Sequence, residues 1–150
     1  MNIENTEMQS YTLSVYTENN IGLLNRVSSI FLKRHINIES LTTSQSEIEN
    51  VNRFVIVATM SPLQAEKIVK QLEKQIEVIK AYAHTDEETI YQETALFKVA
   101  SDSLFDERQI QNIIKDSHAN IVTVSREFFV IEKTGRRHET EQLYQDLKPY

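Results

Sequence analysis

The residues best suited to chemistry lie in one stretch near the N-terminus, Glu18-Asn19-Asn20-Ile21-Gly22-Leu23-Leu24-Asn25-Arg26-Val27. Its pattern predicts a strand, a short polar turn and a helix that opens at Gly22. Backbone N–H groups at a helix N-terminus bind a small carboxylate well. A second asparagine, Asn37, precedes Ile38 at the entry to the next predicted strand. This combination predicts a binding site for a free amino acid, and it does not predict covalent chemistry.

We expect the N–H groups of Gly22, Leu23 and Leu24 to receive the ligand carboxylate, because glycine allows close backbone approach. The side-chain amides of Asn19 and Asn37 both donate and accept hydrogen bonds. Either amide could therefore meet the carboxylate or the ammonium group of the ligand. The structural alternatives are a simple helix-initiating turn at the glycine and a cap or turn role for each asparagine.

The aliphatic wall of the site is predicted to come from Leu24, Ile38 and Leu41. Ile38 directly follows an asparagine of the site, whereas leucines at these spacings are more often core residues. A hydrophobic pocket separates ligands that differ by one methylene by only ~1–3 kcal/mol. The sequence therefore does not distinguish valine from leucine or isoleucine as the ligand.

Composition limits the classes of protein to consider. Charged residues make up 25% of the 150 residues and the net charge is −6, which argues against a general attraction to nucleic acid or to an anionic membrane. The longest apolar strand-like run is 54–58, far short of the ~20 residues that a membrane helix needs. The acidic start does not resemble a secretory signal. The absence of cysteine excludes disulfides, thiolate metal sites and a cysteine nucleophile. We expect a soluble cytoplasmic protein.

The first half of the chain reads as a βαββαβ unit. Alternating apolar residues predict strands, and apolar residues at helical spacing predict helices. Ser61-Pro62 is a helix start, with serine as the cap and proline at the first helical position. The predicted strands are 11–17, 38–46, 53–60 and 78–84, with helices at 22–35 and 62–74 and a polar turn at 46–50. This order is that of a ferredoxin-like unit, in which two helices cover one face of an antiparallel sheet.

The second half repeats that order without its last strand. The predicted strands are 94–100, 121–125 and 128–133, the helices are 106–117 and 139–147, and a turn is predicted at 134–136. The fragment His35-Ile36-Asn37-Ile38 returns as His118-Ala119-Asn120-Ile121, 83 residues later. The predicted fold class is therefore α+β, with two tandem ferredoxin-like units. The predicted boundaries are a tail at 1–10, a first domain at 11–84, a linker at 85–93 and an incomplete domain at 94–150, whose sheet has an open edge.

The opening motif resembles that of one known family. The motif Glu18-Asn19-x-x-Gly22-Leu23-Leu24-x-Arg26-Val27, followed by Asn37-Ile38-Glu39-Ser40-Leu41, closely resembles the start of the acetolactate synthase small, or regulatory, subunit. The resemblance continues through Arg53-Phe54, 71–74 and 78–80, so it covers the first unit. It extends more loosely through 96–99 and 143–150.

The resemblance implies an ACT domain that dimerises through its sheet and holds a branched-chain amino acid, usually valine, at the interface. It also implies a catalytic large subunit that carries thiamine diphosphate, magnesium and FAD, none of which is expected to bind this chain. The small subunit would activate that partner and confer feedback inhibition without catalysing a reaction itself. The missing last strand departs from the family pattern, and the bulk of Ile21 and Leu23 leaves the choice of ligand open.

Other features have structural readings. His35 and His118 suit the negative ends of two helices, and neither has a second metal ligand at suitable spacing, so no metal site is predicted. The acidic run 86–88 reads as a solvated linker. Lys133, Arg136 and Arg137 read as a solvated hairpin end, although they could meet a phosphate or an acidic partner.

Two competing functions share the predicted fold. One is an interaction or amino-acid-sensing module that regulates a different enzyme. The other is an RNA-binding sheet, which needs stacking aromatic residues and a basic surface. Tyr11, Phe54 and the negative charge do not favour the RNA-binding sheet. The sequence contains no nucleophile–base pair and no phosphate-binding glycine loop.

Overall fold

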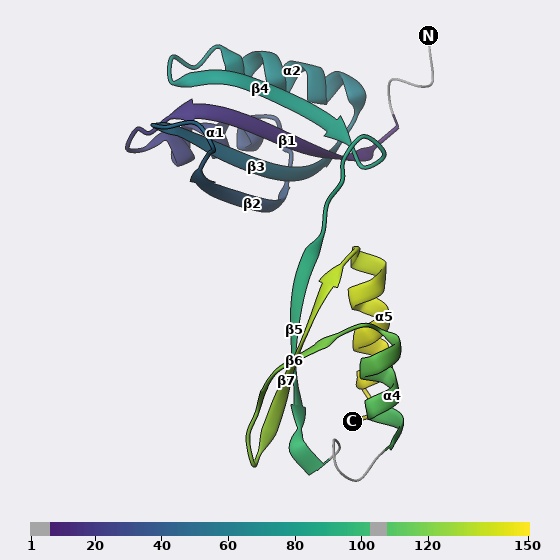
Figure 1. Ribbon diagram of the computed structural model, residues 1–150. Helices are drawn as coiled ribbons and strands as arrows, with labels where there is room; N and C mark the ends of the chain where they lie inside the picture. The colour runs from purple at the N-terminus through teal and green to yellow at the C-terminus, as the bar shows by residue number, and fades with distance from the viewer. Residues whose placement is uncertain (1–6, 103–107) are drawn as a thin grey trace. The chain divides into compact units, whose positions relative to one another are not determined.

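The computed structural model describes residues 7–102 and 108–150 (Figure 1). Residues 1–6 of the predicted tail and residues 106 and 107 of a predicted helix lie outside the described residues. The chain divides into two compact units, residues 1–90 and 91–150. Each unit is described by itself below.

The first unit is a four-stranded antiparallel sheet with two helices. Its elements are β1 (Gln9–Glu18), α1 (Leu23–Lys33), β2 (Ile38–Gln45), β3 (Val51–Met60), α2 (Pro62–Glu73) and β4 (Val78–Thr85). The strand order is β2-β3-β1-β4, so β2 and β4 are the edge strands. The two helices lie on one side of the sheet (Figure 1). This arrangement confirms the ferredoxin-like βαββαβ prediction.

Alternation along the central strands builds the core of the first unit. Leu13 and Val15 of β1 are fully buried and lie opposite Ile56 and Phe54 of β3 in the register. The residues between them point to the uncovered face of the sheet. The helices contribute the apolar stripes that their spacing predicts: Leu23, Val27, Ile30 and Phe31 from α1, and Ala65, Ile68 and Leu72 from α2.

The start of α2 is capped as its sequence predicts. The Ser61 hydroxyl accepts a hydrogen bond from the Gln64 N–H at 3.3 Å, and the Gln64 side chain accepts one from the Ser61 N–H at 2.9 Å. This reciprocal pair is a capping box, and Pro62 occupies the first helical position. Two of the N–H groups at the start of α2 are therefore already paired.

The second unit consists of β5 (Glu93–Ala100), α4 (Arg108–Asp116), β6 (Asn120–Val124), β7 (Phe128–Gly135) and α5 (Arg137–Leu147). Its antiparallel strands have the order β5-β7-β6. No described strand pairs with the outer edge of β5, as the prediction of an open edge requires. The core is small and is made by Val99, Ile110, Ile114, Phe129, Ile131, Leu143 and Leu147.

The predicted turn at 134–136 is wrong. Strand β7 continues to Gly135, which pairs with Glu93 of β5, and α5 follows at once with Arg136 as its N-cap residue. The Arg136 N–H donates to a Glu139 carboxylate oxygen at 2.7 Å, which closes the helix start. The connection is therefore shorter than the sequence suggests, because the strand runs directly into the helix cap.

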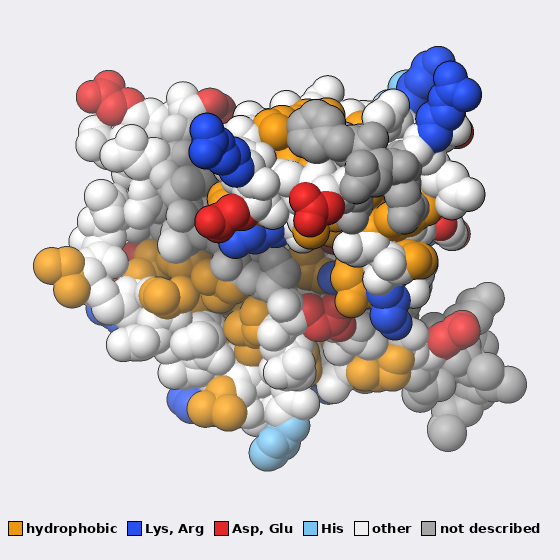
Figure 2. Space-filling view, turned by 90° about the horizontal axis from the view of Figure 1, so that it is seen from below, with side chains coloured by type: hydrophobic (Ala, Val, Ile, Leu, Met, Phe, Trp, Pro, Cys, Tyr) orange, Lys and Arg blue, Asp and Glu red, His pale blue; other side chains and the backbone are white. Residues whose placement is uncertain are grey.

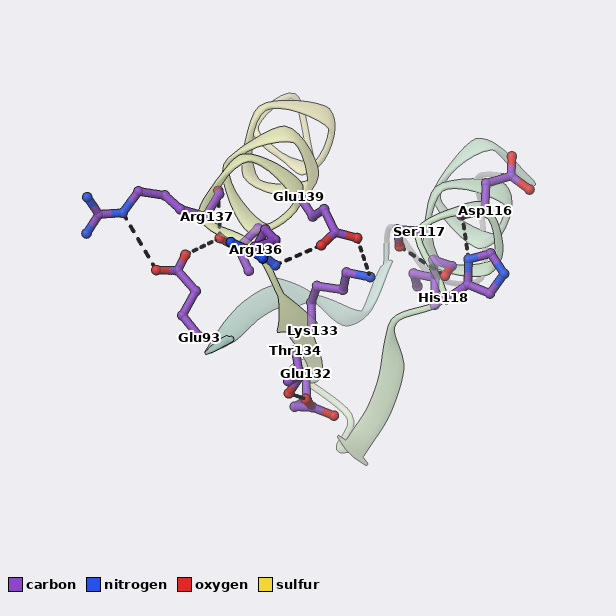
Figure 3. Close-up of polar contacts among 12 residues, drawn as sticks. Glu93, Asp116, Ser117, His118, Glu132, Lys133, Thr134, Arg136, Arg137 and Glu139 are labelled. Carbon is purple, nitrogen blue, oxygen red and sulfur yellow. Dashed lines mark hydrogen bonds and ion pairs between the residues drawn. The ribbon is translucent and has the colours of Figure 1, made fainter. Parts of the chain in front are cut away.

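Two of the three basic residues of this region are not solvated as the sequence predicts. The Lys133 side chain is only 11% exposed, and its Nζ lies 3.7 Å from a Glu139 carboxylate oxygen (Figure 3). The Arg136 guanidinium lies over the Tyr91 ring, 4.6 Å from its centroid. Arg137 pairs with Glu93. Lys133 and Arg136 are therefore occupied within the second unit, whereas the Arg137 side chain remains 78% exposed.

The repeated His-x-Asn-Ile fragment marks the same helix ending in both units. His35 and His118 both adopt the left-handed conformation, with φ 55° in each. In each unit the residue after the histidine donates its N–H to a carbonyl five residues earlier, at 3.1 Å: Ile36 to Phe31 and Ala119 to Ile114. This is a Schellman ending, where glycine is the usual residue. The two units therefore end this helix in the same way at the first residue of the repeated fragment.

Replacing His35 with glycine is expected to raise the free energy of unfolding by up to about 1 kcal/mol. Glycine adopts positive φ without the steric cost of a Cβ, and this gain exceeds the added entropy of the unfolded chain. His35→Ala keeps the Cβ and is the control, with no gain expected. Urea denaturation of the three proteins measures the difference, and an equal gain for both variants would contradict the backbone explanation.

Candidate functional site

The N-terminus of α1 is open, unlike that of α2. Gly22 precedes the helix with φ 81°, in the left-handed region, and no side chain caps the helix. The first turn contains no acidic residue. A Cβ built on Gly22 would meet no described atom within 4 Å. Because the first N–H groups of a helix lack intrahelical acceptors, this end is suited to an anion in the open space beside it.

Hydrogen bonds hold the loop between β1 and α1 in place. The Asn19 side-chain oxygen accepts a hydrogen bond from the Asn52 amide of β3 at 3.1 Å. The Leu23 N–H donates to the Asn20 carbonyl at 3.4 Å, a long contact that leaves the N–H weakly held. Neighbouring residues thus hold the loop in place. The first-turn N–H groups of α1 have weak internal partners or none among the described residues.

An ion pair that was not predicted anchors the same helix end. Arg26 pairs with Glu77, and the Glu18 N–H donates to the Glu77 carbonyl at 2.9 Å. Glu77 directly precedes β4, so the pair ties the start of α1 to the start of that edge strand. No local pattern announces it, because 51 residues separate the partners. The role of Asn52 was also missed, since an asparagine in a strand carries no comparable signal.

The pKa of the Glu77 carboxyl is lowered from its ordinary value of 4.5, first by its own backbone N–H and then by the Arg26 guanidinium. A carboxyl whose pKa is lower in the folded state stabilises the fold above the ordinary pKa. It loses that contribution as the pH falls through the lowered value. The ion pair at the start of α1 is therefore expected to be sensitive to acid.

We expect Glu77→Gln to reduce the fall in the urea midpoint between about pH 5 and pH 3. The variant no longer has a carboxyl that prefers the folded state in its ionised form. Glu47→Gln, in the turn after β2, is the control and should follow the unaltered chain. The prediction fails if Glu77→Gln shows the same pH dependence as that control.

The aliphatic residues of the predicted site divide into two groups. The Leu23 side chain is 2% exposed and belongs to the core, so only its backbone is available to a ligand. Leu24 is 46% exposed beside the open helix end, where its side chain can form part of a wall. Ile38 and Leu41 are half-buried against the core. Ile21 is fully exposed, so its bulk does not narrow the space at Gly22.

One copy of the chain does not bring the two halves of the predicted site together. Asn19, Gly22, Leu23 and Leu24 lie at the end of the sheet where Asn52 of β3 pairs with Gln45 of β2. Ile38 pairs with Ala58, near the other end of β3, and Asn37 immediately precedes it. The six residue steps from Asn52 to Ala58 span about 20 Å at ~3.3 Å per residue. The exposed Asn37 therefore cannot meet a ligand at Gly22 of the same copy.

The described structure has few other candidate features outside the start of α1. A groove of about 610 Å³ lies between α4 and α5 of the second unit. The described residues contain no group of three or more His, Asp or Glu side chains that could hold a metal ion. No helix among them is long and apolar enough to cross a membrane. Figure 2 shows charges of both signs scattered between apolar side chains, without one dominant patch.

The first unit combines a βαββαβ fold with an open, glycine-preceded helix end. This fold is that of an ACT domain. Family models support the assignment for both units. Residues 13–80 match the AHAS small subunit-like ACT domain, and residues 92–150 match the small subunit of acetolactate synthase. The chain belongs to the acetolactate synthase small subunit family.

Individual relatives agree with this assignment. The chain is 38% identical to the acetolactate synthase small subunit of Bacillus subtilis over 133 residues. The aligned region covers 88% of this chain and 77% of that protein. It is 37% identical to the acetolactate synthase small subunit of Mycobacterium bovis over 142 residues, which make up 95% of this chain and 84% of that protein. The crystal structure of the small subunit from Thermotoga maritima superposes with a TM-score of 0.80 at 31% identity, over 91% of this chain and 85% of that one.

Proposed function

We propose that this chain is the regulatory, non-catalytic subunit of an acetolactate synthase. It binds a branched-chain amino acid, valine first, where the first units of two copies meet. It activates the catalytic large subunit and confers feedback inhibition in branched-chain amino acid biosynthesis. The observation that carries the proposal is the uncapped, acid-free start of α1 beside the unfilled space at Gly22.

The ligand carboxylate lies against the first-turn N–H groups of α1, which suit an anion. The side-chain amide of Asn19, held by Asn52, provides a further polar group at the same end of the sheet. Leu24 supplies apolar surface for the aliphatic side chain of the ligand. The ammonium group still needs an acceptor, and the side-chain oxygen of Asn37 can provide one.

A second copy supplies that residue if the two β2 strands pair antiparallel across a two-fold axis. β2 is an edge strand, so its outer N–H and C=O groups are available for such pairing. Antiparallel pairing places the start of the partner's β2 beside the end of this β2. Asn37 and Ile38 of one copy then approach the Gly22 loop of the other, and the separation of about 20 Å within one copy no longer matters.

The catalytic partner is proposed to hold thiamine diphosphate, magnesium and FAD, with none of them bound to this chain. Regulation follows if the amino acid binds one arrangement of the complex better than another, because a ligand shifts an equilibrium only by its differential affinity. The second unit is then available for contacts that the first unit does not make.

Calorimetry with valine, leucine and isoleucine tests the proposal directly. We expect heat of binding with one valine per chain, and sedimentation should show a dimer that valine stabilises. The matched variant Asn37→Ala should bind valine more weakly and keep its thermal unfolding temperature. Absence of binding for all three amino acids would refute the proposed function and would favour a module that regulates a different enzyme.

A further inference from the structure

The groove between the two helices of the second unit contains a largely buried lysine. The groove has a volume of about 610 Å³, and its lining comes from α4, the turn after α4, β7 and α5. Lys133 of β7 lies between Glu139, at the start of α5, and the turn at Ser117 and His118 (Figure 3). Lys133 is two residues after the buried Ile131, so its side chain lies on the helix side of the sheet.

The acids around Lys133 leave its ammonium group short of acceptors. Among the described residues its ion pair is with a Glu139 oxygen at 3.7 Å, too long for a strong hydrogen bond. The other oxygen of that carboxylate accepts the Arg136 N–H at 2.7 Å. Glu93 lies diagonally opposite Lys133 on the same face of the sheet, but its two oxygens contact side chains of α5. A largely buried ammonium group in this state costs free energy unless a further acceptor reaches it.

Two histidines line the same groove. The His118 ring uses Nδ1 for the Asp116 carbonyl at 3.1 Å, which leaves Nε2 for a ligand. The pKa of the Glu139 carboxyl is lowered first by a backbone N–H, and the nearby Lys133 and His138 lower it further. Lys133 and His138 therefore lie close to the same carboxylate, at the end of the groove where α5 begins.

The rest of the lining limits the class of ligand. Ile113 and Leu143 provide apolar surface for an aliphatic body. The lining also contains three acidic residues. Asp146 accepts a hydrogen bond from the Gln142 amide at 2.8 Å, and the Asp116 carboxylate points away from Lys133 (Figure 3). A phosphate dianion would meet three acids and one lysine, whereas a carboxylate brings only one negative charge to that lysine.

We propose that this groove is a second small-molecule site, which binds a monocarboxylate with an aliphatic body. The carboxylate accepts hydrogen bonds from Lys133 and from one of the two histidines, and the aliphatic body lies on the apolar wall. Hydrogen bonds between charged groups are stronger than neutral ones, so Lys133 sets the orientation of the ligand. The site belongs to the second unit and does not depend on the proposed amino-acid site at Gly22.

NMR titration of the full chain with 3-methylbutanoate tests the proposal. This acid has the branched body of valine and lacks the ammonium group that the proposed site at Gly22 would recognise. We expect saturable shift changes in residues 112–118 and 138–146, which line the groove. Acetate should bind roughly 10-fold more weakly, because it leaves the apolar wall uncovered. Inorganic phosphate should not displace 3-methylbutanoate.

The variants assign the binding to its residues. Lys133→Met keeps an unbranched side chain without the charge and should raise the Kd roughly 10-fold or more. Lys98→Met is the matched control, because Lys98 is also a strand lysine of the second unit and its ammonium lies over the Phe128 ring. Gly22→Asp should leave this binding unchanged. His138→Ala should raise the Kd a few-fold. It decides the test if Lys133→Met unfolds the unit, because His138 is exposed.

Four outcomes would overturn the site. Absence of saturable binding would mean that water alone solvates Lys133. Equal weakening in Lys133→Met and Lys98→Met would mean a general effect of charge. Loss of binding in Gly22→Asp would place the probe in the first unit, and tighter binding of phosphate would rule out the carboxylate class. None of these outcomes changes the proposed function, which calorimetry with valine tests separately.

Discussion

Gly22→Asp is expected to weaken valine binding by roughly 100-fold or more and to remove feedback inhibition, because opposing like charges at one site cost several kcal/mol. The aspartate carboxylate would occupy the space where the ligand carboxylate is proposed to lie. That space is open, since nothing described lies within 4 Å of a Cβ at Gly22. Aspartate also tolerates positive φ better than most residues, so the helix start should persist. Calorimetry and acetolactate formation with and without valine measure the two effects.

Gly22→Asn is the matched control for charge. Asparagine has nearly the same shape as aspartate and the same tolerance of positive φ, but it is neutral. We expect it to weaken valine binding only a few-fold, while both variants still activate the catalytic subunit. Equal loss in the two variants would mean that steric bulk, and not charge, disturbs the site. Feedback inhibition retained in Gly22→Asp would rule out a carboxylate position at this helix end.

Phe129→Ala should unfold the second unit while the first unit stays folded and binds valine. Phe129 is fully buried in a small core, and truncation of a buried phenylalanine costs about 3–5 kcal/mol. A unit of about 60 residues has little stability to lose, because small domains bury a smaller fraction of their surface. Hydrogen exchange measured by mass spectrometry should show lost protection only in peptides from 91–150.

The adjacent residue provides the control for this experiment. Phe128 points to the opposite face of β7, where the Lys98 ammonium lies 4.1 Å from the centre of its ring. We expect Phe128→Ala to cost less than about 1 kcal/mol, the size of a cation–π contact near a surface. If Phe129→Ala removes protection from both units together, the two units unfold as one and the division at residue 90 has no thermodynamic meaning.

Much of the fold could be predicted because apolar periodicity determines it directly. The alternation of Leu13 and Val15 indicates a half-buried strand. Ser61-Pro62 indicates the start of α2, because serine caps a helix and proline suits its first position. The errors arise where tertiary pairing overrides a local signal. Gly135 suggests a turn, yet its pairing with Glu93 extends β7 up to the helix cap. The sequence predicts a solvated Lys133, but in the folded second unit its side chain is largely buried.

The candidate site was predictable only in part. Gly22 and Asn19 lie in one short motif. Because the free N–H groups at a helix N-terminus favour an anion, that motif alone predicts a carboxylate ligand. Asn52 and the Arg26–Glu77 pair hold the same loop from residues distant in sequence, so no local pattern reveals them.

The distance between Gly22 and Asn37 within one copy has a consequence for how the protein senses its ligand. In the proposed dimer, the two-fold axis relates two equivalent binding sites, and an isolated chain contains neither of them. Apparent affinity for valine should therefore decline on dilution, and sensitivity to the end product should follow the cellular abundance of the subunit as well as the abundance of the amino acid.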